Sequence, residues 1–94
     1  MRAFWREHRL GQRLILIDNE GHEEELGAVR KTRGGFDAIA KTFGYDPGRA
    51  ASGLPSMEEG KRFVESFTPW DLFDGTEGVK VEPGVQSLPG NPAS

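Results

Sequence analysis

The clearest hydrophobic pattern in the chain lies between residues 56 and 67, where apolar and polar residues alternate with helical spacing. The apolar positions recur at steps of three and four residues and share one face: Met57, Gly60, Phe63, Val64 and Phe67. Ser56 and Glu59 have the spacing of a capping box, in which each side chain accepts a hydrogen bond from the other residue's backbone N–H. Pro69 disfavours continuation of the helix. The pattern predicts an amphipathic helix over residues 57–67 that packs on an apolar surface.

Two strands joined by a tight turn are predicted upstream of this helix. Residues 13–18 form a short aliphatic run with the length and flanking residues of a buried strand. Residues 19–21 tolerate positive φ, so a hairpin should return the chain along residues 25–30. The expected register places Val29 on one face of the second strand and three residues on the other: Leu26, Ala28 and Arg30.

The apolar residues in the segment 36–43 fit both the spacing of a helix and the alternation of a strand. As a helix, the segment has an apolar stripe that ends at a left-handed Gly44: Phe36, Ile39, Ala40 and Phe43. As a strand, it divides into two sides, with Phe36, Ala38 and Ala40 on one and Ile39 and Phe43 on the other. Propensity favours the helix, whereas the turn at residues 34–35 leads directly into a third antiparallel strand. We expect the strand.

A change in composition at residue 74 separates a folded part from a tail. From there on, Gly and Pro punctuate the chain and no aromatic residue occurs, so the segment buries too little apolar surface to offset its ordering entropy. The sequence predicts one small α+β domain over residues 1–73 and a disordered Gly/Pro-rich tail over residues 74–94. The domain is an antiparallel three-stranded sheet packed by one C-terminal amphipathic helix. Phe4 and Trp5 either add an N-terminal edge strand or cover one end of the sheet.

Composition narrows the class of function without naming one. A chain of 94 residues holds one domain with little room for a deep pocket, and the lack of cysteine excludes disulfides, thiolate metal sites and a cysteine nucleophile. No apolar run has the length of a signal peptide or a membrane span, so we expect a cytoplasmic protein with no membrane partner. The net charge of -3 is divided into blocks, which are basic over residues 1–13, acidic over 18–25 and basic over 30–33.

Part of the chain resembles a known DNA-binding family. The run from Val29 to Ala38, followed after a loop by Gly53 to Gly60, resembles the strand and the helix entry of the plant AP2 and integrase N-terminal DNA-binding domains. The resemblance covers residues 27–67 and implies a sheet packed by a helix. It also implies that the sheet enters the major groove of DNA. The candidate contacts by position are basic and aromatic: Arg30, Lys31, Arg33, Phe36 and Lys41.

The sequence shows no recognisable catalytic or metal-binding motif. His8 and His22 are the only histidines, and no Ser or Asp is placed to complete a triad with either. The acidic residues around His22 match neither a zinc helix motif nor a calcium loop. The double glycine at 34–35 lacks the spacing of a phosphate-binding loop. We therefore expect no enzymatic activity, no cofactor, no metal and no small-molecule ligand.

Two sets of residues remain as candidates for binding a macromolecule. The first follows the helix and either folds back on the sheet or forms an exposed patch: Trp70, Leu72 and Phe73. The second is basic and suits phosphate contacts, together with the N-terminal arginines: Arg30, Lys31, Arg33 and Lys41. The sequence predicts a non-catalytic interaction domain that binds another protein through charged sheet edges or the first set. Nucleic-acid binding through the second set is the alternative.

Overall fold

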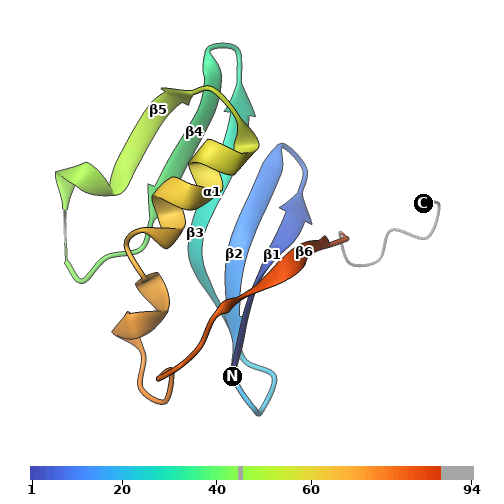
Figure 1. The fold of residues 1–94 in the computed structure, drawn as a ribbon, viewed down its shortest axis with the longest axis vertical. Helices are drawn as coiled ribbons and strands as arrows, with labels where there is room; N and C mark the ends of the chain where they lie inside the picture. The colour runs from blue at the N-terminus through green and yellow to red at the C-terminus, as the bar shows by residue number, and fades with distance from the viewer. Residues whose placement is uncertain (45, 88–94) are drawn as a thin grey trace.

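The structure is a computed structural model that describes residues 1–44 and 46–87. In this part of the chain the strands are β1 (Arg2–His8), β2 (Gly11–Ile17), β3 (Glu23–Thr32), β4 (Gly35–Ala40), β5 (Ala50–Leu54) and β6 (Val81–Gln86). The helices are α1 (Met57–Glu65) and two short 3-10 helices, η1 (Pro47–Arg49) and η2 (Pro69–Leu72). The strands form one sheet in the order β5-β4-β3-β2-β1-β6 (Figure 1). The predicted α+β class is confirmed.

The sheet is larger than the predicted three strands, and it is mixed rather than antiparallel throughout. Neighbouring strands run antiparallel except β1 and β6, which are parallel. Phe4 and Trp5 lie within β1, which pairs with β2 along its whole length and has β6 on its other side. They therefore belong to an inner strand and not to an edge. Two segments expected as loop and tail, residues 50–54 and 81–86, supply the strands at the edges.

Residues 35–40 form a strand, as the turn at residues 34–35 indicates. Ala38 and Ala40 are buried in the core, whereas Ile39 between them points to the other face and is 43% exposed. This alternation has the period of two that the strand interpretation requires. Phe43 lies beyond the end of β4 and is 94% exposed, so it does not extend the strand.

A bulge alters the expected pattern of β3. Leu14 pairs with Gly27 and Ile15 pairs with Glu25, which leaves Leu26 as an extra residue in β3. Leu26 is fully buried in the same core cluster as Val29. The prediction that Leu26 shares a face with Ala28 and Arg30 is therefore wrong. It requires a regular register between β2 and β3, whereas β3 carries one extra residue at the bulge.

Helix α1 packs on the sheet as predicted, and of the two hydrogen bonds of the predicted capping box the structure shows the one that Ser56 accepts. The Ser56 hydroxyl accepts a hydrogen bond from the Glu59 backbone N–H at 3.1 Å. The Glu59 carboxylate pairs with Arg62 at 3.2 Å. Gly60 brings the helix against the sheet, since a Cβ at this position would lie only 2.5 Å from Cγ1 of Val29. The helix ends two residues earlier than predicted, at Glu65.

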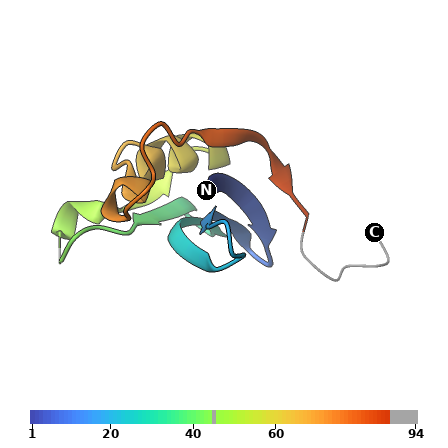
Figure 2. The same cartoon turned by 90° about the horizontal axis from the view of Figure 1, so that it is seen from below.

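The core lies between α1 and the sheet. Its buried members come from four strands and the helix: Ala3, Trp5, Leu14, Leu16, Leu26, Val29, Ala38, Ala40 and Val64. Trp5 is 1% exposed, and its indole Nε1–H donates to Oε2 of Glu65 at 2.8 Å. Figure 2 shows that α1, η2 and the segment leading to β6 lie on the same side of the sheet. No helix in the described residues covers the opposite side, which we call the open face.

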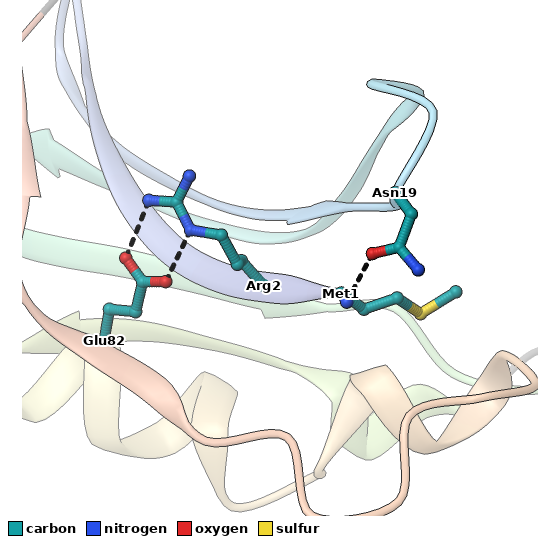
Figure 3. A network of polar contacts seen from close by, with 4 residues as sticks. All are labelled: Met1, Arg2, Asn19 and Glu82. Carbon is teal, nitrogen blue, oxygen red and sulfur yellow. Dashed lines mark hydrogen bonds and ion pairs between the residues drawn. The ribbon is translucent and has the colours of Figure 1, made fainter.

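Residues 74–87, which belong to the predicted tail, include strand β6 and make several contacts with the rest of the domain. The buried Thr76 hydroxyl contacts the carbonyl oxygens of Trp70 and Phe73, both at 2.9 Å. The Arg2 guanidinium forms two bonds of 2.7 and 2.9 Å with the Glu82 carboxylate, which joins β1 to β6 (Figure 3). Val79 and Val81 also pack against the core, a contact that apolar content alone does not predict. The rest of the predicted tail, residues 88–94, lies outside the described residues.

Candidate functional site

The side chains of the open face form rows across the strands. The strand register places His8, Gly11, Arg30 and Asp37 in one row, closest to the β1–β2 turn. The next row along the strands is Arg6, Arg13, Ala28 and Ile39. These positions alternate with those that meet the helix, such as Val29, so they lie on the face that α1 leaves uncovered.

The part of the open face near the β2–β3 turn is closed by ion pairs. Phe4 and Ile15 are only 3% and 6% exposed although no helix covers them. The guanidinium groups of Arg2 and Arg6 each lie 5.3 Å from the centre of the Phe4 ring. Arg6 also holds the Glu23 carboxylate through bonds of 2.9 and 2.8 Å. Paired side chains therefore replace a second layer over these apolar residues.

The same ion pairs lower the pKa values of their carboxylates. The pKa of Glu23 is lowered below its ordinary value, mainly by the hydrogen bonds from Arg6. The hydrogen bonds from Arg2 likewise lower the pKa of Glu82. Arg13 pairs with Glu25 at 3.0 Å. Three of the four arginines in the first 13 residues thus form ion pairs with carboxylates, whereas Arg9 forms none with a described residue.

The opposite end of the sheet carries cations that are not paired with carboxylates of the described residues. Arg9 lies in the β1–β2 turn and Arg33 in the β3–β4 turn, and these two turns lie at the same end of the sheet (Figure 1). Arg30 and Lys31 belong to the end of β3, where the Lys31 backbone N–H donates to the Leu10 carbonyl oxygen at 2.8 Å. We call this group the cationic end: Arg9, Arg30, Lys31 and Arg33. All four are exposed, and none makes an ion pair with a described residue.

The basic residues singled out from the sequence do not all lie together. Arg30, Lys31 and Arg33 are in the cationic end, whereas Lys41 follows the opposite end of β4. Its Nζ lies 3.9 Å from Glu24 and 5.7 Å from the centre of the Phe73 ring. Lys41 is therefore separated from the other candidates by the length of β4. The position of Arg9 beside β3 depends on the pairing of β1 with β2, which the sequence left open.

The segment after the helix takes the folded-back alternative. Trp70 and Phe73 are partly buried and pack against the core, while Leu72 is 38% exposed. An exposed patch of three large side chains is therefore not formed, and Leu72 is the member that keeps an accessible surface. Binding of a protein through residues 70–73 stays a prediction.

The acidic and histidine side chains of the described residues bear on the question of a metal site. Among the described residues, no group of three or more such side chains is placed to hold a metal ion. His22 contacts Asp18 at 3.1 Å in the β2–β3 turn, where backbone hydrogen bonds, led by that from His22, lower the Asp18 pKa. No helix in the described part of the chain is both long and apolar enough to cross a bilayer.

Comparison of the chain with family models, curated proteins and solved structures gives no match. The resemblance to AP2 and integrase N-terminal domains therefore stays a prediction.

Proposed function

We propose that the protein is a non-catalytic nucleic-acid-binding domain that contacts phosphate groups with its cationic end. One observation carries the proposal. Two turns and the end of β3 place four exposed cations at one end of the sheet, and none of them makes an ion pair with a described residue, although most of the other arginines of the sheet are paired with glutamate. Unpaired, exposed arginine and lysine side chains are the groups that bind the phosphate backbone and release its counterions.

The acidic run in β3 is far enough from this end to leave phosphate binding possible. Glu24 lies near the start of the strand and Lys31 near its end, seven residues apart. At a rise of roughly 3.3 Å per residue the separation is about 23 Å. The Debye length at physiological ionic strength is only about 8 Å, so repulsion from the exposed Glu24 is largely screened at the cationic end. Glu23 and Glu25 are neutralised by Arg6 and Arg13.

The number of free cations sets the expected salt dependence. Four phosphate contacts give a slope of log K against log salt of about -3.6 on duplex DNA and about -2.8 on a single strand. Between 50 and 200 mM salt, duplex affinity should then fall roughly 100-fold. Such binding is moderate and sequence-independent, because phosphate contacts position a protein without reading bases.

Fluorescence anisotropy with a labelled random duplex and a labelled single strand, each over a series of salt concentrations, tests this function. The double variant R30Q/K31Q should reduce affinity for both probes and make the duplex slope shallower by about 1.8. The matched control K41Q/K80Q removes the same net charge from exposed lysines outside the cationic end and should leave the slope unchanged. Flat traces at the lowest salt concentration refute the proposal. Equal losses in the two double variants would mean that only net charge matters.

A further inference from the structure

A hollow in the open face lies directly beside the cationic end. It has a volume of about 580 Å³ and is bounded by the β1–β2 turn, the start of β2 and the end of β3. Its lining includes His8, Leu10, Gly11, Arg13, Ala28 and Arg30. Pockets for small organic groups commonly have volumes of about 300–1,000 Å³, so the hollow is large enough for a planar ring system.

Two neighbouring strands border the hollow with small residues. Gly11 of β2 has no side chain, and Ala28 of β3 contributes one methyl group in the adjoining row. A Cβ on Gly11 would lie 1.9 Å from the Val29 carbonyl oxygen, so no larger residue fits at this position without movement of β3. Further along the same face, Phe4 and Ile15 fill the equivalent space.

The lining combines apolar surface with cations. Leu10 is 61% exposed, and with Ala28 it gives the hollow an apolar contact surface. Arg9 and Arg30 line the same hollow and belong to the cationic end, so their guanidinium groups are free to stack on a ring or to bind a phosphate. A nucleobase with its own phosphate presents a flat apolar ring and an anion at adjacent positions, which matches both features.

We propose, on the basis of the function argued above, that the hollow receives an unpaired nucleobase and that the protein therefore prefers single-stranded nucleic acid to duplex. A base inside a duplex is stacked and paired, so it does not reach a recess in a protein surface unless it is extruded. A base in a single strand is free to leave its neighbours and stack on arginine or apolar side chains, while the backbone follows the cations.

The test compares affinities of the full chain for a labelled single strand and for the duplex of the same sequence at one salt concentration. The wild-type protein should bind the single strand at least about 10-fold more tightly. Ala28→Leu fills the hollow and should bring the ratio of the two affinities close to one. Ala50→Leu is the matched control, because Ala50 pairs with Ile39 on the same face but does not line the hollow, and it should keep the wild-type ratio.

A second probe makes the result independent of how well the variants fold. A single strand of the same length made of abasic nucleotides retains the phosphates but has no rings to enter the hollow. The wild-type protein should bind it about 10-fold more weakly than the normal strand. Equal affinity for the two strands, or an unchanged ratio in a folded Ala28→Leu variant, overturns the base-binding proposal while leaving phosphate binding intact. Failure to bind any probe at low salt instead refutes the proposed function.

Discussion

Replacement of Gly60 by alanine gives a direct measure of how closely α1 lies on the sheet. Alanine has the better helix propensity and alone would stabilise the helix by about 1 kcal/mol. In this position, however, its Cβ would lie 2.5 Å from Cγ1, 3.1 Å from Cγ2 and 3.4 Å from Cβ of Val29. Rotation of Val29 about χ1 does not remove the conflict, because the whole isopropyl group faces the helix and valine has few χ1 alternatives.

The magnitude follows from these opposed effects. Added methyl groups in a packed core typically cost about 1–3 kcal/mol. After the propensity gain is subtracted, Gly60→Ala should lower the free energy of unfolding by about 1 kcal/mol. In a Val29→Ala background the conflicting methyl groups are absent, so the same Gly60→Ala change should raise the free energy of unfolding by about 1 kcal/mol relative to Val29→Ala alone.

Urea unfolding of the wild type, both single variants and the double variant, followed by tryptophan emission, completes this double-mutant cycle. The expected outcome is a change of sign for Gly60→Ala between the two backgrounds. If Gly60→Ala stabilises the wild-type background as much as the Val29→Ala background, the helix does not lie as close to β3 as the structure places it.

Three further predictions concern contacts elsewhere in the fold. Ser56→Ala removes the cap of α1 and should cost about 1 kcal/mol in urea unfolding, so an unchanged midpoint would contradict the capping role. Glu65→Ala leaves the buried indole N–H of Trp5 without its acceptor and should cost about 1–3 kcal/mol, whereas Glu65→Gln keeps an oxygen there and should cost less, as thermal unfolding will show. Because Arg6 lowers the pKa of Glu23, the stability from this pair is present above the ordinary pKa of 4.5 and is lost as pH falls through the folded value. The difference in urea midpoint between wild type and Glu23→Gln should therefore shrink from pH 7 to pH 3, and a constant difference would argue against the ion pair.

Local signals in the sequence predict local structure well in this chain. The capping residue Ser56, the turn at residues 34–35 and the alternation around Ile39 each depend on neighbours within a few positions, and the structure agrees with all three. Their physical basis is short-range: side-chain acceptors near a helix start, residues that permit tight turns, and the period of a pleated strand.

Errors arise where the deciding contact joins distant parts of the sequence. Strand β6 depends on pairing with β1 and on the Arg2–Glu82 ion pair, whose members are 80 residues apart. Apolar content within residues 74–87 carries no information about that partner. The bulge at Leu26 is of the same kind, because only the register between β2 and β3 shows that one strand holds an extra residue.

The candidate site was accessible from the sequence only in part for the same reason. The run Arg30 to Arg33 is visible as a basic block, and its position at a turn indicates exposure. Arg6 and Arg13 do not add to this block, because each pairs with a glutamate across the sheet. Arg9 does add to it, because it makes no ion pair with a described residue. Counting arginines in the N-terminal segment therefore overestimates the free positive charge.

Only some of the residues that line the hollow can be substituted without a change in the packing of the sheet. Gly11 lines the hollow, and the Val29 carbonyl oxygen lies where a side chain at this position would be, so a substitution there disturbs β3 and, through Val29, the contact with Gly60 of the helix. Ala28 lines the same hollow with its side chain directed to the open face, away from α1. The size of the hollow can therefore be altered at Ala28 with little effect on the core, whereas substitutions at Gly11 should change binding and stability together.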